Sequence, residues 1–263
     1  MIKSIKYFIA KNRESFVLKV LYELAVKYIH AYKNSNYDFV TNGELALLKK
    51  VAKEGNSQIF FDIGANKGDW VNVVLELFKE PKIHCFEAIP QIFTKLKQNI
   101  PTNNTCFLNN FGLWNEDTTI TFTYFKDEDQ KSSAYFESVQ MISEKVEVPV
   151  RKGEDYCKEN NIECIDFMKI DVEGAEGKII EGFEKMIQQN KIKIIQFEYG
   201  RFNIDAGYLL KHFFNLFEKN GYKVGKLYPT TIDFSGYNYE KEDFLGPNYV
   251  AILEKYYKNF ESL

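Results

Sequence analysis

The sequence predicts an α/β fold, in which helices cover both faces of a mainly parallel seven-stranded sheet and a helical extension precedes that sheet. Between residues 58 and 255, short apolar stretches alternate with segments whose apolar residues recur at helical spacing, and this alternation is typical of parallel sheets. Hydrophobic residues make up 45% of the 263 residues and aromatic residues 16%, which is ample for a buried core. We expect a helical N-terminal extension over residues 1–40 and one α/β domain over residues 41–263.

The first 33 residues predict a basic amphipathic helical region. They contain seven lysine and arginine residues but only two glutamates, around the apolar sequence FVLKVLYELAVKYI. Two interpretations remain open: the region is a helical cap packed on the main domain, or it lies peripherally on a membrane surface. No apolar stretch is long enough to span a bilayer, and the apolar start is too soon interrupted by charge for a secretory signal.

Composition argues against several classes of function. A net charge of −3 and a pI near 5.8 disfavour nucleic acid as a partner, because such binding needs a concentrated basic surface. The four cysteines form no C-x-x-C pair and there are three histidines, so neither a familiar zinc site nor a disulfide framework is indicated. Free thiols suit a reducing compartment, so we expect a cytoplasmic protein, with contact at the membrane surface as a further possibility.

Capping and strand signals predict the first half of the domain. Thr41 and Glu44 are spaced as in a capping box, and the helix that follows ends at Gly55. A second helix ends before Pro81, and a third has Pro90 at its first position. Strands are expected over residues 58–64 and 82–88 and from residue 105.

The second half of the chain repeats the alternation of strands and helices. No repeat of fixed period and no low-complexity linker separates the halves, so we expect one domain. Residues 118–125 alternate polar and apolar side chains. The remaining strands are expected over residues 164–171, 193–200, 222–228 and 247–255, and the remaining helices over residues 174–190 and 207–221.

The turn after the first strand has the sequence DIGANKG, which predicts a ligand-binding loop. Gly64 and Gly68 remove side chains where a backbone approaches a ligand, and Asn66 tolerates the left-handed conformation. Asp62 suits a ligand that carries an ammonium group, although it could also simply cap the turn. Glu87 ends the second strand, where a carboxylate can accept hydrogen bonds from both ribose hydroxyls of a nucleoside.

A nicotinamide dinucleotide fits this turn less well. Its pyrophosphate requires a G-x-G-x-x-G sequence and a free helix N-terminus, whereas this chain lacks that spacing. Asp62 would also repel a pyrophosphate. An NAD(P)-dependent oxidoreductase therefore remains only an alternative.

Three motifs in order, DIGANKGDW, CFEAIPQIFTKLKQNI and IDFMKIDVEGAEGKIIEGF, closely resemble the FkbM-type methyltransferase family. The similarity extends over about residues 38–253 and includes TNGE before the first strand. The resemblance implies a Rossmann-like class I methyltransferase fold and S-adenosyl-L-methionine as cofactor. It further implies an O-methyltransferase whose acceptor is a hydroxylated small molecule or glycan, such as a sugar or glycoconjugate.

The resemblance also implies the residues that bind the cofactor. The turn would hold its methionine end, Glu87 its ribose, and the segment after the third strand its adenine or sulfonium side. The expected cofactor-binding residues are Asp62, Gly64, Ala65, Asn66, Gly68, Glu87, Asn109, Asn110 and Gly112.

Methyl transfer to an alcohol needs alignment of the acceptor oxygen and removal of its proton. Asp171 ends the fourth strand, Glu173 opens the helix after it, and Glu198 lies at the end of the fifth strand. All three are at the sheet edge where ligands bind and are the candidate catalytic residues. Glu173 could instead complement a helix dipole, and Lys169 could simply neutralise Asp171. The acidic residues also permit a divalent metal, although nothing in their spacing indicates one.

The acceptor itself cannot be read from these motifs. The aromatic segments over residues 132–140 and 197–208 could line an acceptor pocket or serve packing. A methyltransferase-like binding protein without catalytic activity is a further alternative. The sequence predicts no oligomeric state.

Overall fold

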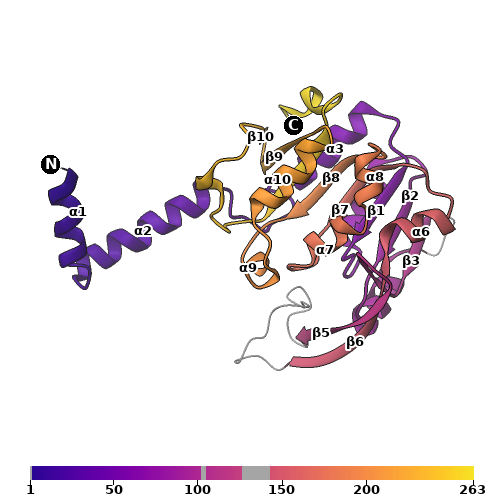
Figure 1. The fold of residues 1–263 in the computed structure, drawn as a ribbon, viewed down its shortest axis with the longest axis horizontal. Helices are drawn as coiled ribbons and strands as arrows, with labels where there is room; N and C mark the ends of the chain where they lie inside the picture. Colours follow the sequence, from indigo (N-terminus) through magenta and orange to yellow (C-terminus); the bar gives the residue numbers. More distant parts are fainter. Residues whose placement is uncertain (1, 102–104, 126–142) are drawn as a thin grey trace.

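The computed structural model, which describes residues 2–101, 105–125 and 143–263, has an α/β body and a projecting helical arm (Figure 1). The body is built on an eight-stranded sheet in the order β10-β9-β11-β8-β7-β1-β2-β3. The strands from β3 through β1 to β8 are parallel, whereas β11 runs antiparallel to both β8 and β9. The strands are β1 (Ile59–Ile63), β2 (Lys82–Phe86), β3 (Cys106–Asn109), β7 (Ile165–Ile170), β8 (Ile192–Glu198), β9 (Tyr222–Tyr228), β10 (Thr231–Asp233) and β11 (Asn248–Leu253).

The predicted Rossmann-like α/β fold is therefore confirmed. All seven expected strands are present, and the sheet gains β10, a three-residue strand at its edge. The alternating residues 118–125 form β5 of a second sheet, in the order β4-β6-β5, which curves away at the bottom of Figure 1. Its strands are β4 (Gly112–Trp114), β5 (Thr118–Phe125) and β6 (Ser143–Lys152). Residues 126–142, which include the aromatic segment 132–140, lie outside the described residues.

Helices cover both faces of the large sheet. One face packs against α3, α4 and α5 through residues such as Leu48, Val74 and Leu96. The opposite face packs against α6, α7, α8 and α10 through residues such as Ile180 and Phe217. The helices of the body are α3 (Glu44–Glu54), α4 (Asp69–Leu77), α5 (Pro90–Asn99), α6 (Gly153–Glu159), α7 (Glu176–Glu181), α8 (Glu184–Gln188), α9 (Phe202–Ala206) and α10 (Leu210–Lys219), with short 3-10 turns at η2 (Tyr239–Lys241) and η3 (Tyr257–Phe260).

Two local predictions were wrong. The single helix expected over residues 174–190 is divided into α7 and α8 at Gly182, where any side chain would collide with the carbonyl oxygen of Trp114. The expected capping box is also absent, because Gly43 is the N-cap of α3 and the Thr41 hydroxyl donates to Asp38 Oδ2 at 2.6 Å. The close approach of β4 therefore interrupts the helix at Gly182. A local turn at Asp38 takes up the Thr41 hydroxyl that the capping box would have used.

The N-terminal extension forms α1 (Ile2–Lys11) and α2 (Phe16–Tyr32), which project away from the body (Figure 1). No residue of α2 is buried, so the interpretation of this region as a packed cap was wrong. The chain meets the body at Lys33, which pairs with Asp243 at 3.2 Å, and at the buried Asn34, which donates to the Leu227 carbonyl at 2.9 Å. Among the described residues, no helix is both long and apolar enough to cross a membrane.

The glycines of the turn after β1 serve close packing of the protein itself. Gly64 has φ +85°, and a Cβ at this position would collide with the carbonyl oxygen of Asp171, which follows β7. At Gly68, a Cβ would lie 2.5 Å from Ile100 Cδ1. Gly64 is therefore required by a neighbouring backbone atom, whereas Gly68 is favoured mainly by its left-handed φ of +90°. Contact of either glycine with a ligand remains a prediction.

This close approach predicts that Gly64→Ala lowers the free energy of unfolding by about 3 kcal/mol or more, because overpacking adds to the cost of a left-handed alanine. Gly207→Ala is the matched control, since Gly207 also has a left-handed conformation but a Cβ added there would meet no atom within 4 Å. The control should lose about 1 kcal/mol. Urea denaturation of both variants measures the difference, and equal losses would contradict the close contact.

Candidate active site

A cavity of about 410 Å³ lies where β1, β2, β7 and β8 end. Its lining includes the turn after β1 on one side and a group of acidic residues at the ends of β7 and β8 on the other. Of the predicted cofactor-binding residues, Asp62, Gly64, Ala65, Asn66, Glu87 and Gly112 line it, as do all three predicted catalytic residues, Asp171, Glu173 and Glu198. Gly68, Asn109 and Asn110 are not among its described lining residues.

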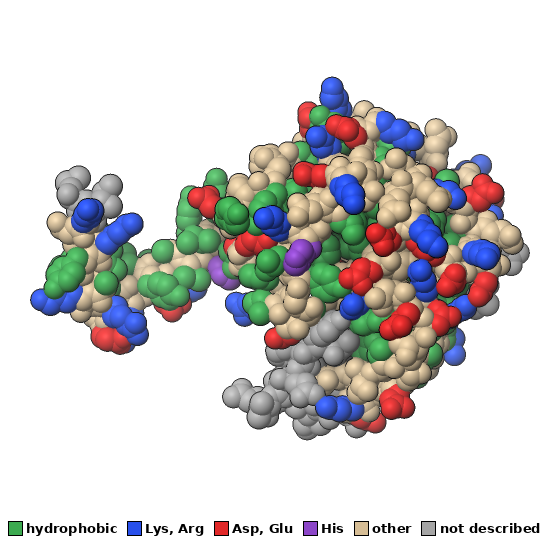
Figure 2. Space-filling view, in the orientation of Figure 1, with side chains coloured by type: hydrophobic (Ala, Val, Ile, Leu, Met, Phe, Trp, Pro, Cys, Tyr) green, Lys and Arg blue, Asp and Glu red, His purple; other side chains and the backbone are tan. Residues whose placement is uncertain are grey.

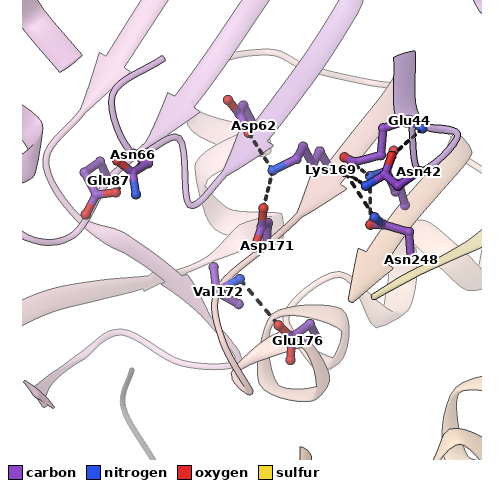
Figure 3. Close-up of polar contacts among 11 residues, drawn as sticks. Asn42, Glu44, Asp62, Asn66, Glu87, Lys169, Asp171, Val172, Glu176 and Asn248 are labelled. Atoms are coloured by element: carbon purple, nitrogen blue, oxygen red, sulfur yellow. Dashed lines mark hydrogen bonds and ion pairs between the residues drawn. The ribbon is translucent and has the colours of Figure 1, made fainter. Parts of the chain in front are cut away.

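Asp62 is a buried carboxylate at the cavity wall. Its side chain is 1% exposed, and among the described residues neither oxygen accepts a hydrogen bond. Burial raises its pKa to about 6, against the opposing effect of Lys169, whose Nζ lies 3.9 Å from Oδ1 (Figure 3). An unsatisfied carboxylate at a cavity wall is suited to a ligand that brings a positive charge and hydrogen-bond donors.

Glu87 is held in place by the two loops that flank it. The backbone amide of Asn66 donates to Oε2 at 3.1 Å, and that of Ile89 donates to Oε1 at 2.9 Å. Asn66 has φ +47°, so the predicted left-handed conformation is present and directs this amide at the carboxylate. These two amides orient the Glu87 carboxylate at the cavity wall.

Asn109 at the end of β3 and Asn110 directly after it support the loop that carries Glu87. The Asn109 side-chain amide donates to the carbonyl of Cys85 at 3.0 Å, and the Asn110 amide donates to the carbonyl of Glu87 at 3.0 Å. These contacts fix the end of β2 against the end of β3. Contact of either asparagine with a cofactor remains a prediction.

Lys169 joins the two sides of the cavity. It lies on β7 beside Asp62 on β1, and its Nζ contacts Asp171 Oδ2 at 2.7 Å. Despite burial, the neighbouring carboxylates of Asp171, Asp62 and Glu44 hold the pKa of Lys169 above its ordinary value. The predicted neutralisation of Asp171 is thus present, and it extends to Asp62.

A buried polar network that the sequence analysis missed lies beside Lys169 (Figure 3). It is centred on Glu44 at the start of α3, whose Oε2 accepts from Gln196 Nε2 at 2.6 Å. Its Oε1 accepts from Asn42 Nδ2 at 2.7 Å and from Asn248 Nδ2 at 3.0 Å. The available signal was a polar residue within or beside an apolar strand, at Lys169 in β7, Gln196 in β8 and Asn248 at the start of β11.

Asp171, Glu173 and Glu198 make the other side of the cavity acidic. Burial, and then the charges of Asp171 and Glu173, raise the pKa of Glu198 well above its ordinary value. Glu173 has φ +53°, an uncommon conformation for this residue type. Tyr37 lines the same region, and desolvation followed by the charges of Glu198 and Glu173 raises the pKa of its hydroxyl.

Glu176 has a structural position next to this group. Its Oε1 accepts the Gly174 amide at 3.2 Å and its Oε2 accepts from Asn203 Nδ2 at 3.2 Å. Burial raises its pKa to about 7. It therefore fastens the loop that carries Glu173 to the adjacent helix α9.

The described residues contain no group of three or more His, Cys, Asp or Glu side chains that could hold a metal ion. His84 lies in the core, with Nδ1 2.7 Å from the Tyr156 hydroxyl. His212 Nδ1 accepts a hydrogen bond from the backbone amide of Leu209 at the start of α10. Neither histidine is among the cavity's described lining residues.

The chain is similar in sequence to known methyltransferases. The sequence model of the methyltransferase FkbM domain matches residues 62–224. The 2-O-methyltransferase NoeI of Sinorhizobium fredii is 26% identical over 164 residues, which cover 57% of this chain and 67% of that protein. Methyltransferase 1 of Beauveria bassiana is 23% identical over 153 residues, 51% of this chain and 61% of that protein. A putative caffeoyl-CoA O-methyltransferase structure from Staphylococcus aureus, 14% identical, aligns with a TM-score of 0.42 over 94% of this chain and 98% of that one.

The position of Lys169 predicts that Lys169→Met destabilises the protein by about 3–5 kcal/mol at pH 8, because Asp62 is then a buried charge without compensation. Removing the cation raises the pKa of Asp62 further above its value in the unfolded chain. The folded state then binds more protons, so stability falls as pH rises through the interval between the two pKa values.

Urea denaturation at pH 5 and pH 8 measures this effect, and the loss should be smaller at pH 5. Lys178→Met is the matched control, because Lys178 is 34% exposed and pairs with Glu181 at the surface. The control should change stability by less than about 0.5 kcal/mol. A loss at position 169 that is independent of pH would instead indicate packing.

Proposed function

The chain belongs to the FkbM methyltransferase family, and we propose that it transfers a methyl group from S-adenosyl-L-methionine to a hydroxyl of a sugar, glycoconjugate or related metabolite. The observation that carries the choice of cofactor is the unsatisfied carboxylate of Asp62 at the cavity wall. The choice of a hydroxyl acceptor is supported by the acidic group on the opposite side. A 2-O-methyltransferase among the relatives is consistent with it.

The residues present fit this cofactor. Asp62 would accept hydrogen bonds from the ammonium of its methionine end, which would satisfy the buried carboxylate. Glu87, held by two backbone amides, would accept from the ribose hydroxyls. When bound, S-adenosyl-L-methionine supplies an activated methyl group and its leaving group.

The alternative of a nicotinamide-dependent oxidoreductase has less support from the same residue. A pyrophosphate near Asp62 would bring negative charge to a carboxylate that has no hydrogen-bond donor among the described residues. Such a contact would cost free energy, because the pyrophosphate would leave water beside the buried Asp62 carboxylate and neither would gain a compensating positive charge. Family membership also favours methyl transfer.

Asp171 is the residue we assign as general base. Its side chain is 37% exposed, it lines the cavity, and Lys169 fixes one of its oxygens. The proton of an acceptor hydroxyl would pass to Asp171 as the oxygen takes up the methyl group, and this assistance is typically worth a factor of about 10²–10⁴.

Glu198 and Glu173 would position the acceptor. The raised pKa of Glu198 favours a protonated carboxyl, which donates a hydrogen bond to an acceptor oxygen rather than removing its proton. Glu173 would contact the acceptor from the loop after β7. The three acidic residues thus have different roles although they share one region.

The cofactor assignment predicts that Asp62→Asn weakens binding of S-adenosylhomocysteine by about 30-fold or more, because a buried charged pair is lost. Methylthioadenosine retains the ribose but lacks the ammonium, so its affinity should change by less than about threefold. Glu87→Gln should weaken both ligands. Calorimetric titration of each variant measures these constants.

The same carboxylate predicts a pH dependence. The affinity of the unsubstituted protein for S-adenosylhomocysteine should fall as pH drops through about 6, because protonated Asp62 no longer attracts the ammonium. Asp62→Asn should abolish this dependence. Saturable binding of NADH, with no binding of S-adenosylhomocysteine at any pH, would revive the oxidoreductase alternative.

The proposed base predicts that Asp171→Asn lowers the turnover number by about 10²–10⁴, with less than about a threefold change in cofactor affinity. Transfer of labelled methyl from S-adenosyl-L-methionine to a panel of sugars and hydroxylated metabolites measures turnover. Asp205→Asn, an exposed substitution on α9, is the control.

Equal losses in turnover and cofactor affinity would reassign Asp171 to cofactor binding. Tight cofactor binding without label transfer to any acceptor would favour the non-catalytic binding protein.

A further inference from the structure

The two N-terminal helices form a surface that nothing in the described chain covers. We define the arm as residues 2–33, which comprise α1, α2 and their connection. The arm extends away from the body in Figure 1, and Figure 2 shows hydrophobic side chains along it with lysines and arginines between them. This position leaves the arm available for a partner outside the chain.

The apolar surface of the arm is extensive. On α1, Ile5, Phe8 and Ile9 follow the spacing of one helix face and are 48–60% exposed. On α2, apolar residues extend around more than half of the helix, and Phe16 is 81% exposed. The other exposed large hydrophobic residues of the arm are Tyr7, Val17, Val20, Leu21, Tyr22, Leu24, Tyr28, Ile29 and Tyr32. Such a patch marks an interaction surface.

The charge of the arm differs in sign from that of the rest of the chain. Residues 1–33 carry seven lysine and arginine residues and two glutamates, which leaves 27 basic and 35 acidic residues in the remaining chain. A basic helix with an apolar face is suited to an anionic lipid surface, because lysine side chains can extend toward phosphates while apolar residues enter the acyl boundary. Tyrosine, abundant on the arm, is suited to the same interface.

Self-association explains the surface less well. A two-stranded coiled coil buries a narrow seam of apolar residues, whereas the apolar residues of α2 occupy more than half of its circumference. Two arms would also bring like charges together. A lipid surface accommodates both the wide apolar face and the positive charge.

We propose that the arm is a peripheral anchor that binds bilayers containing anionic lipids. Phe8 and its neighbours on α1 enter the lipid surface, together with the apolar face of α2, and the lysines contact lipid phosphates. The segment after the arm contributes Tyr37 and Phe39 to the cavity lining, so a docked arm holds that part of the cavity close to the membrane. This proposal does not depend on the methyl transfer reaction.

Co-sedimentation of the full chain with vesicles tests the anchor. One set of vesicles contains phosphatidylcholine alone, and the other contains about one-third phosphatidylserine. We expect at least tenfold tighter binding to the anionic vesicles, which weakens when salt is raised from about 0.1 to 0.5 M. Lys3→Glu, Lys6→Glu and Lys11→Glu together should reduce affinity by more than about 100-fold, at roughly fivefold per lysine removed.

The control has the same charge change on the body, through Lys158→Glu, Lys185→Glu and Lys219→Glu, which are exposed positions. It should bind within about threefold of the unsubstituted protein. Both triple variants should melt close to the unsubstituted protein, because all six lysines are exposed.

Insertion of the apolar face is tested with Phe8→Trp. The native tryptophans, Trp70 and Trp114, are 6% and 9% exposed, so a blue shift on adding anionic vesicles reports the new side chain. Absence of binding, equal binding to neutral vesicles, or equal losses in the two triple variants would overturn the proposal. If the blue shift instead appears without vesicles when the protein concentration is raised, and light scattering gives a doubled mass, the arm mediates self-association.

Discussion

The site depends on one buried cation, the ammonium of Lys169. It lies between Asp62 on one side and Asp171 on the other, at 3.9 and 2.7 Å. A lysine in this position is costly to remove from water, and the two carboxylates compensate that cost. Since β1, β7 and β8 are parallel, register alone places Asp62, Lys169 and Gln196 in one row across the sheet. The ammonium of Lys169 therefore compensates a carboxylate on each side of the cavity, Asp62 on one and Asp171 on the other.

The balance of charge around Lys169 leaves room for a ligand. Asp171 has a close partner, but both oxygens of Asp62 lack a hydrogen bond within the described residues. Its pKa of about 6 records the cost of keeping this carboxylate buried. A bound ammonium group would remove much of that cost, so the fold holds an unfavourable group ready for binding. Glu87, by contrast, is already oriented by two amides.

The sequence predicted the elements whose signals are local. Apolar stretches predicted the strands, and Asn66 predicted a left-handed turn. The order of the motifs also brought Asp62, Glu87, Asp171 and Glu198 to the same edge of the sheet. The role of Gly64 could not be predicted, because it depends on the carbonyl of Asp171, more than 100 residues later.

The segment TNGE shows the same limit. Its spacing matched a local capping box, but Glu44 accepts hydrogen bonds from Gln196 and Asn248 on distant strands. Local spacing cannot reveal a partner that tertiary packing supplies. The arm is a similar case, since an amphipathic sequence does not show whether its apolar face meets the body or something else.

Buried hydrogen bonds and an ion pair fix the base of the arm to the body. Asn34 is 7% exposed, and its side-chain amide donates to the carbonyls of both Asn42 and Leu227, at 2.8 and 2.9 Å. Lys33 adds a pair with Asp243. Buried hydrogen bonds of this kind hold a chain more firmly than an exposed linker does. The Asn42 side chain then joins the Glu44 network beside Lys169, so one short segment connects the base of the arm to the charge on which the site depends.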